Sequence, residues 1–372
     1  MPKNGFSRQI FNKAMIIKIG DQLKTVFSEF EYKSFISRAS SFNPNEGLKG
    51  RANHITDALI QYLPNDFKIS ANIINSTFKP IESNHANWNN FIYMPYAIYV
   101  ERKGCKKEHI NLSLNLLKAI TIRFTSEFSI RTFLVNFPEA TFATLNKWVF
   151  DENPHVRRLV SEACRPRLPW AKEINEFKKN PNFCIELLEL LKNDDSKYVQ
   201  RSVANHMNDI TKDNPKLALD ILAKWKKENN PNTNWIVKHA LRNELKKGTL
   251  KALEIEGYSS SPQIHISNFC LSSKSIKKGD SLTFSFTIKN NGENKVGLMI
   301  DYVCYFMKSN GKKSPKTFKI RKVQLCKNKS ITVEKNQSFK PISTRKIYEG
   351  EHKIVLFING KLFDEKSFYL RL

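Results

Sequence analysis

The chain has 372 residues, of which 61 are Lys or Arg and 35 are Asp or Glu, so its formal charge is +26. This length predicts two or three domains that can each bury a core, and the lack of an apolar run of 18 residues argues against a transmembrane helix. Such an excess of positive charge predicts a polyanionic partner, nucleic acid ahead of anionic lipid, with compositional bias toward Lys, Asn, Ile and Phe as the alternative.

Several common site types lack support in the sequence. The first 20 residues are basic but show no apolar segment followed by a cleavage site, so secretion is not expected. Six scattered cysteines form no CxxC pair and no Cys/His cluster, which argues against a zinc finger or an iron–sulfur cluster and favours free thiols. The chain has no HExxH, GxGxxG, GxxxxGK(S/T) or GxSxG motif.

Helical patterns dominate the chain up to residue 256, and three segments within them align without gaps. They are HVRRLVSEAC (155–164), YVQRSVANHM (198–207) and WIVKHALRNE (235–244), at spacings of 43 and 37 residues. Each follows another helical segment, which is TLNKWVF, IELLELL or ALDILAKW. Paired helices at this period are typical of HEAT-like repeats, which stack into a solenoid. An ordinary helical bundle with chance similarity is the alternative interpretation.

The aligned segments predict one apolar and one polar face. The apolar stripe matches Val156, Val160 and Cys164 with Val199, Val203 and Met207. The polar stripe matches Arg158 and Glu162 with Arg201 and Asn205, and then with Lys238 and Arg242. Stacked repeats are expected to bury the first stripe and to align the second on one wall. A wall rich in basic residues suits a nucleic-acid backbone.

After residue 256 the pattern changes to short alternating apolar runs. They are QIHISNFCL, SLTFSFTIKNNG, VGLMIDYVCYFMKSNG, TFKIRKVQLC, HKIVLFINGKLF and KSFYLRL, with Asn-Gly turn signals at 291–292, 310–311 and 359–360. Six or seven such strands predict an immunoglobulin-like β-sandwich. We therefore predict a mainly α chain with a helical domain over 1–256 and a sandwich over 257–372. The sandwich has 22 Lys and Arg against 8 Asp and Glu, so it is the more densely basic part.

Three carboxylates lie among the bases of the helical half. Glu162 is one turn from Arg158 and three residues from Arg165, and Asp209 is expected to end its helix. Glu127 lies at a predicted helix start. A solvated acid paired with an Arg on the same helix is the plainer interpretation of each. Three acids on a basic wall instead favour a functional site.

Two long segments of the helical half form a distinctive pattern, FTSEFSIRTFLVNFPEATFATLNKWVFDENPHVRRLVSEACRPRLPWA and YVQRSVANHMNDITKDNP. With them, the chain resembles the AlkC branch of the HEAT-like-repeat DNA alkylation repair glycosylases, which are related to AlkD. The amino-terminal pattern of the AlkC branch is matched more loosely, by LKGRANHITDAL (48–59) and FIYMPYAIYVERKG (91–104). LTFSFTIKNNGENKVGLMIDYVCYFMKSNGKKSPKTFKIR is similar to the immunoglobulin-like domain of some AlkC proteins. The resemblance covers essentially the whole chain. Its most specific feature is the combination of RRLVSE and RPRLPW with SVANxxND, which few helical-repeat proteins share.

The resemblance implies a monofunctional DNA glycosylase of base excision repair. Such an enzyme would use no cofactor or metal and would act as a monomer on duplex DNA in the bacterial cytosol and nucleoid, away from membranes. Its expected substrates are cationic N3-alkylated bases such as 3-methyladenine and 3-methylcytosine, with the preference between them left open, and the base is not flipped into a pocket. A cationic base leaves readily, so carboxylates need only stabilise the sugar oxocarbenium and direct a water to C1′.

The resemblance also implies which residues form the site. The expected catalytic residues are Glu127, Glu162, Asp209 and Trp170. The expected DNA contacts are Arg157, Arg158, Arg165, Arg201, Asn205, Lys238, Arg242, Lys312 and Lys313, with Lys277, Lys278 and Lys316 as further candidates in predicted turns. Trp170 offers a ring face to the cationic base or sugar, and core packing is its alternative. The lysines of the sandwich are equally expected to be merely solubilising. One departure is Glu244, which occupies a position expected to be apolar.

Two other functions remain open at this point. One is a non-catalytic HEAT-repeat scaffold or DNA-binding protein, which release of a free base from methylated DNA would exclude. The other is association with a membrane surface through the lysines, which predicts liposome binding that survives competition by DNA. All three acids stand at their motif positions, and this favours the enzyme.

Overall fold

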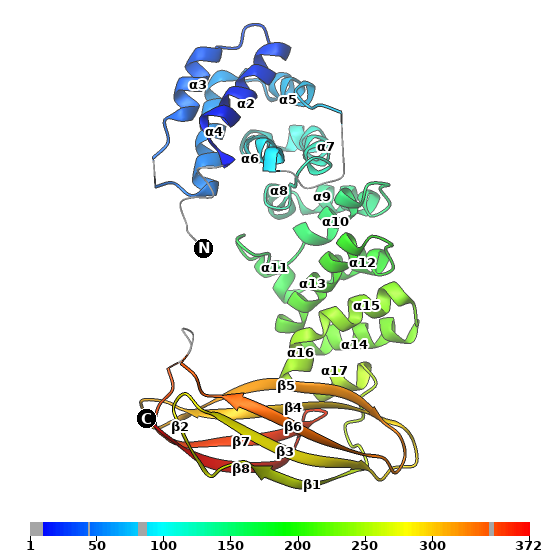
Figure 1. The fold of residues 1–372 in the computed structure, drawn as a ribbon. Coiled ribbons are helices and arrows are strands. Elements are labelled where there is room, and N and C mark those ends of the chain that lie inside the picture. The colour runs from blue at the N-terminus through cyan, green and yellow to red at the C-terminus, as the bar shows by residue number, and fades with distance from the viewer. Residues whose placement is uncertain (1–9, 44, 81–87, 342–345) are drawn as a thin grey trace. The chain divides into compact units, whose positions relative to one another are not determined.

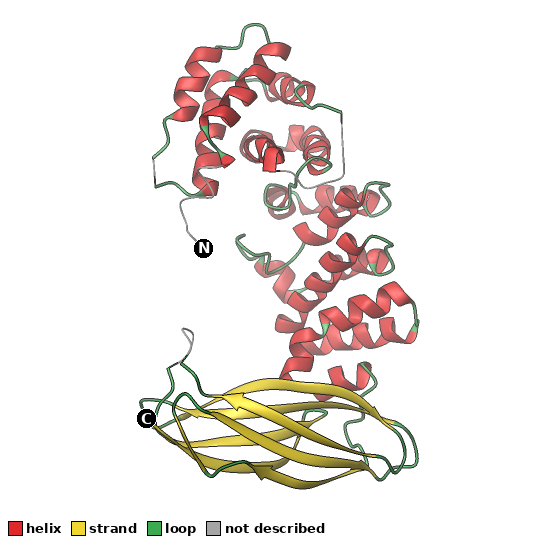
Figure 2. Cartoon of the chain, viewed as in Figure 1, coloured by secondary structure: helices red, strands yellow, loops and turns green. Residues whose placement is uncertain are grey.

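The computed structural model describes residues 10–43, 45–80, 88–341 and 346–372, which form two compact units (Figure 1). The first unit comprises Met1–Pro215 and Asn229–His239, and the second comprises Lys216–Glu228 and Ala240–Leu372. Helices come first and strands last, as Figure 2 shows, so the predicted order of structure is confirmed. Within the described ranges, no helix has both the length and the apolar character needed to cross a bilayer.

The first unit is helical throughout its described part. Its elements in chain order are α2 (Lys13–Val26), α3 (Tyr32–Ser40), α4 (Leu48–Tyr62), α5 (Phe67–Ser76), η1 (Trp88–Tyr93), α6 (Met94–Gly104), η2 (Lys107–His109), α7 (Ile110–Thr121), α8 (Ile130–Asn136), α9 (Pro138–Trp148), α10 (Pro154–Ala163), α11 (Asn175–Lys179), α12 (Asn182–Leu191), α13 (Lys197–Asp213) and α15 (Pro231–Ala240). The first two aligned segments lie in α10 and α13, each after the partner helix that the sequence predicts.

Helices α10 and α13 are in contact with one another, and their predicted apolar stripes lie in the core. All six residues of those stripes are fully buried, namely Val156, Val160, Cys164, Val199, Val203 and Met207. Helix α10 begins with a proline in its first turn, and the Asn153 side chain accepts a hydrogen bond from the His155 backbone N–H at 2.9 Å. This cap and this proline satisfy the requirements of a helix start, which is why the helix begins there.

The third aligned segment is broken, although the sequence predicts one helix over 235–244. Helix α15 ends at Ala240 and α16 (Arg242–Lys247) begins two residues later. Glu244 lies in α16 and is buried, but its carboxylate accepts hydrogen bonds from Lys247 Nζ at 2.6 Å and Thr249 Oγ1 at 2.8 Å. An acid at an expected apolar position is thus tolerated because it is paired.

Over its described residues, the second unit contains three helices and eight strands. The helices are α14 (Pro215–Lys227), α16 and α17 (Leu250–Ile255). The strands are β1 (Ile264–Leu271), β2 (Ser275–Lys277), β3 (Ser281–Asn290), β4 (Val296–Met307), β5 (Lys313–Leu325), β6 (Ser330–Ser338), β7 (Gly350–Ile358) and β8 (Lys361–Arg371). They form a three-stranded sheet, β1-β3-β6, and a five-stranded sheet, β2-β8-β7-β4-β5. A core that includes Phe284, Phe286, Tyr302, Leu356 and Phe368 is shared by both sheets.

Two strands escaped the sequence prediction. Strand β2 has only three residues, and β6 reads as polar because its buried positions are Val333 and Gln337. The side-chain amide oxygen of Gln337, Oε1, accepts a hydrogen bond from the buried Tyr302 hydroxyl at 2.7 Å. An amide can therefore occupy an inward position where the alternating pattern expects an apolar side chain. The three Asn-Gly dipeptides do lie between strands, as predicted.

The last helices are tied to the sandwich at the β7–β8 turn. A Cβ on Gly360 would lie 2.4 Å from the Gly248 carbonyl oxygen, so only glycine permits this approach of backbones. The buried Asn359 side chain donates to the carbonyl oxygens of Ser259 at 2.9 Å and Gly297 at 3.1 Å. Both turn residues have positive φ, 47° and 76°, which suits an Asn-Gly hairpin turn. Strands begin after Gly257, while the predicted division of the domains at 256–257 stays a prediction.

Candidate functional site

Three buried carboxylates of the first unit are joined by two arginines in one continuous chain. Arg158 Nη1 donates to Glu127 Oε2 at 3.1 Å, and Arg158 Nη2 lies 3.6 Å from Glu162 Oε1. Arg165 then donates from Nη1 to Glu162 at 2.7 Å and from Nε to Asp209 at 2.8 Å. These five residues, here called the acid cluster, are the predicted carboxylates together with two of the predicted DNA-binding arginines. The structure therefore brings them together.

The cluster is assembled by one face of α10, one face of α13 and the segment before α8. Arg158 and Glu162 are one turn apart on α10, and Arg165 follows that helix directly. Asp209 projects from the side of α13, because this helix continues to Asp213; the prediction that Asp209 ends its helix was wrong. Ser202, two turns earlier on α13, donates to Glu162 Oε2 at 2.7 Å and fixes that carboxylate between the helices.

The charges of the cluster are paired. Three carboxylates face two guanidinium groups. Lys212, whose side chain is 42% exposed, donates to Asp209 at 2.8 Å and supplies the third positive charge from the solvent side. Burial raises the pKa of Glu162, yet the charges of Arg158 and Arg165 outweigh burial and hold this pKa below its ordinary value.

A buried histidine, which the sequence analysis missed, connects the two helices. His206 is fully buried on α13, and its Nδ1 lies 2.9 Å from the Ser161 carbonyl oxygen on α10. Burial, helped by the charge of Arg165, lowers the pKa of His206 to about 3. The ring therefore stays neutral at physiological pH and donates from Nδ1 to the carbonyl, which holds α13 against α10.

The loop after α10 is fixed by a second residue that sequence reasoning missed. Arg131 on α8 is buried and donates to the carbonyl oxygens of Ala163, Arg165 and Lys172, each at 2.7 Å. The acceptors include the carboxyl end of α10, where unpaired carbonyls and the helix dipole favour a cation. One guanidinium thus holds both ends of the loop that carries Trp170. No local sequence signal predicts this contact, since the partners lie more than 30 residues away.

Trp170 lies in this loop, exposed and in a strained conformation. Its φ is +64° and it is 91% exposed, so core packing, the alternative for this residue, is wrong. Arg167 braces the loop by donating to both carboxylate oxygens of Asp213 at 2.7 and 2.8 Å and to Glu173 at 2.8 Å. A large ring held outward at positive φ by a braced loop is typical of a functional contact.

The remaining predicted DNA-binding residues of the first unit differ in their surroundings. Arg157 donates to the Asp194 carboxylate at 2.6 and 3.0 Å and to the carbonyl oxygens of Asp151 and Glu152 at 2.8 and 2.9 Å. It therefore ties successive inter-helix loops together, and its contact with DNA stays a prediction. Arg201 on α13 and Lys238 on α15 are exposed, and Asn205 is half-buried.

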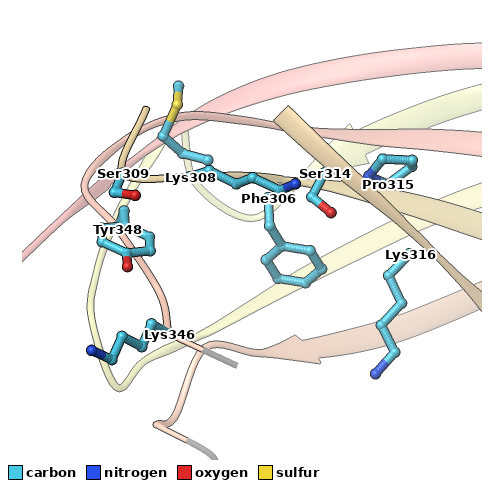
Figure 3. A pocket seen from close by; sticks show the side chains of 9 residues that line it. Phe306, Lys308, Ser309, Ser314, Pro315, Lys316, Lys346 and Tyr348 are labelled. Carbon is cyan, nitrogen blue, oxygen red and sulfur yellow. The ribbon is translucent and has the colours of Figure 1, made fainter. Parts of the chain in front are cut away.

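The predicted basic residues of the second unit lie on α16 and on the sandwich. Arg242 is half-buried on α16, and Lys312 is exposed in the β4–β5 turn. Lys278 also lies in a turn, whereas Lys277, Lys313 and Lys316 lie on strands, which corrects the expectation of turns for those three. Lys313 pairs with Glu351 at 3.2 Å. Figure 3 shows a hollow of about 500 Å³ whose lining includes Lys308, Lys316, Lys346 and Tyr348.

No group of three or more His, Cys, Asp or Glu side chains in the described part of the chain is arranged to hold a metal ion.

The carboxy-terminal part of the chain is similar to known proteins. Residues 265–372 match the family model described as uncharacterised protein YhaZ, C-terminal Ig-like domain. The uncharacterized protein YhaZ of Bacillus subtilis (strain 168) is 35% identical over 362 residues, which cover 97% of this chain and 98% of YhaZ.

A solved structure is similar over its whole length. It is the Pseudomonas fluorescens alkylpurine DNA glycosylase AlkC bound to DNA containing an abasic site analog, which is 31% identical with a TM-score of 0.82. The match covers 98% of this chain and 99% of that chain. With the sequence motifs and the two-part fold, these similarities show that the chain belongs to the AlkC-type family of DNA alkylation repair glycosylases that carry a carboxy-terminal immunoglobulin-like domain.

Proposed function

We propose that this protein is a DNA glycosylase of base excision repair that hydrolyses the N-glycosidic bond of alkylated bases in duplex DNA. Whole-chain similarity to an alkylpurine DNA glycosylase supports the reaction class. The observation that carries the proposal is the acid cluster, in which three buried carboxylates outnumber the two guanidinium groups that join them. Carboxylates held in place by such pairing suit a transition state that carries positive charge.

The proposed substrates are N3-alkylated bases, 3-methyladenine and 3-methylcytosine, because alkylation at this position makes the base cationic. A cationic base departs as a neutral molecule and takes the bonding electron pair with it, so no strong general acid is needed. The positive charge then passes to the deoxyribose as an oxocarbenium. Water attacks C1′ and its proton passes to a carboxylate, which completes hydrolysis.

The proposed roles follow from how each carboxylate is held. Glu127 and Asp209 stabilise the oxocarbenium and position the water. Glu162 touches both arginines and Ser202, so it orients the cluster and has a supporting role. Trp170 contacts the lesion from its braced loop. The exposed ring lies outside any core, so the base can stay in the duplex, with affinity drawn from backbone contacts and bending of the DNA.

The proposed DNA contacts are Arg157, Arg158, Arg165, Arg201, Asn205 and Lys238 in the first unit and Arg242, Lys312 and Lys313 in the second. The proposed working form is a cytoplasmic monomer. The helical domain would carry the chemistry, and the basic sandwich would supply phosphate contacts, as its density of lysines suggests.

Release of free base from methylated duplex DNA tests the proposal. Glu127→Gln and Asp209→Asn keep the shape of each side chain and remove its charge, so base release should fall by at least about 100-fold, as expected for loss of transition-state electrostatics. Glu186→Gln is the matched control, because this exposed carboxylate lies on α12. Wild-type rates in both cluster variants, with binding unchanged, would overturn the assigned roles. No base release by the wild-type protein would favour the non-catalytic DNA-binding alternative.

A further inference from the structure

Aromatic rings recur at the first position of the three aligned segments, where His155, Tyr198 and Trp235 correspond. The ring of Tyr198 meets that of His155 edge-on, with 5.4 Å between the centroids. Trp235 stacks on His239, one turn further along α15, with 5.0 Å between the centroids. Tyr198 remains 44% exposed despite its size. All four residues belong to the first unit, and the proposed chemistry uses none of them.

Two of these rings lie beneath a cation contributed by the preceding repeat. The Arg158 guanidinium carbon is 5.2 Å from the ring centroid of Tyr198, and Lys197 Nζ is 5.6 Å from the ring centroid of Trp235. Both distances fall within the range of about 6 Å over which a cation is attracted to an aromatic face. Such a ring restricts a long side chain to a few rotamers, so its charge is in place before a ligand arrives.

Exposed cations continue this pattern along the same helices. Arg201 and Lys238 occupy the fourth position of the second and third segments, as Arg158 does in the first, and both are exposed. The carboxylate of Asp209 lies eight residues beyond Arg201 on α13, or about 12 Å along the helix axis. Lys197, Tyr198 and Arg201 thus lie toward the amino-terminal end of α13, about two to three turns before Asp209.

We propose that Tyr198, Trp235, Lys197, Arg201 and Lys238 form a binding row for the sugar–phosphate backbone of a DNA strand beside the acid cluster. The cations neutralise phosphates, Trp235 holds Lys197 and Tyr198 holds Arg158 in place, and both rings offer apolar edges to the deoxyriboses. This inference rests on the proposed function, which brings DNA to this part of the first unit. It adds that the contact continues into the third segment and depends on rings as well as on charge.

Binding of an undamaged, fluorescently labelled duplex at several salt concentrations tests the row without a chemical step. Tyr198→Leu and Trp235→Leu should each weaken binding about 2–5-fold, which corresponds to loss of one exposed cation–π contact. They should leave the slope of log K against log salt unchanged, because no charge is lost. Lys197→Ala should reduce that slope by about 0.9, because one phosphate contact disappears. Tyr198→Phe keeps the ring and should bind like the wild type.

Phe183→Leu is the matched control, since this exposed ring lies on α12, outside the row. Wild-type affinity in both leucine variants, with wild-type melting curves, would overturn the inference, as would an equal loss in the control. Base release by the wild-type protein is measured separately. Weakened binding in the ring variants of a protein that releases no base would retain the row and reject the enzyme. Base release by the wild-type protein, together with wild-type DNA binding by the ring variants, would retain the enzyme and reject the row.

Discussion

The exposed ring of Trp170 contributes almost nothing to burial, so its removal should not destabilise the protein. A buried aromatic side chain removes about 150–250 Å² from water, and Trp170 is 91% exposed, which leaves about 20 Å² buried. At about 25 cal/mol per Å² this burial stabilises the fold by about 0.5 kcal/mol. The left-handed backbone at φ +64° costs about 1–2 kcal/mol for a residue with a Cβ.

Two substitutions separate the strain from the ring. Trp170→Ala removes the ring and keeps most of the strain, so the free energy of unfolding should change by no more than about 0.5 kcal/mol. Trp170→Asn also removes the ring, but asparagine tolerates this conformation, so stability should rise by about 0.5–1 kcal/mol. The corresponding rise in Tm is about 1–4 °C for a unit of this size. Both variants should lose base release, because the proposed lesion contact is absent.

Thermal unfolding followed by circular dichroism measures the first effect, and base release from methylated duplex measures the second. A loss above about 2 kcal/mol in Trp170→Ala would show that the ring is packed in solution, which refutes the burial argument. Equal Tm values for the two variants would show that the left-handed residue stores no strain. Full activity in Trp170→Asn would mean that the ring is exposed for a reason unrelated to the reaction.

Three further predictions concern the paired and close-packed groups. Arg165→Leu leaves two buried carboxylates without their shared partner, so the first unit should lose about 3–5 kcal/mol, measured by urea unfolding. Burial raises the pKa of Asp301 in β4 to about 6, so the folded state binds this proton more tightly and stability should fall as pH rises from about 4 to 6. Asp301→Asn should remove that dependence and stabilise the sandwich by about 2 kcal/mol at pH 7. Thermal denaturation over pH 4–7 measures this, and a variant whose Tm depends on pH as steeply as that of the wild type would contradict it. Gly360→Ala should destabilise the second unit by at least about 2 kcal/mol, because its Cβ would meet the Gly248 carbonyl; a melting temperature equal to the wild type would show that the turn can move away.

The sequence predicted the elements whose signal is local and periodic. The stripes of α10 and α13 follow from apolar residues at every fourth position, and all six residues are buried. The acid cluster was predicted because its carboxylates lie within recognisable motifs of a family. The break between α15 and α16 was not predicted, since WIVKHALRNE aligns without gaps with the segments of the unbroken helices α10 and α13.

Contacts between distant segments were beyond the reach of the sequence. The ion pair of Arg157 with Asp194 was not predicted, because Asp194 lies in a loop outside the aligned segments. Arg131 and His206 act on backbone carbonyls, and any residue supplies a carbonyl, so their partners leave no trace in the sequence. Strand β6 was missed because the amide of Gln337 is satisfied by one hydroxyl within the core.

The approach of Gly248 to Gly360 has a consequence for how this protein can be divided or recombined. A cut at residue 256 follows the change in secondary structure, but it separates α16 and α17 from the turn that they pack against. A sandwich excised there would expose the buried side of the β7–β8 turn, and a helical fragment would end in two unsupported short helices. The transferable module is therefore the sandwich together with α16 and α17. An exchange of this module between relatives should succeed only when the glycine pair travels as a unit.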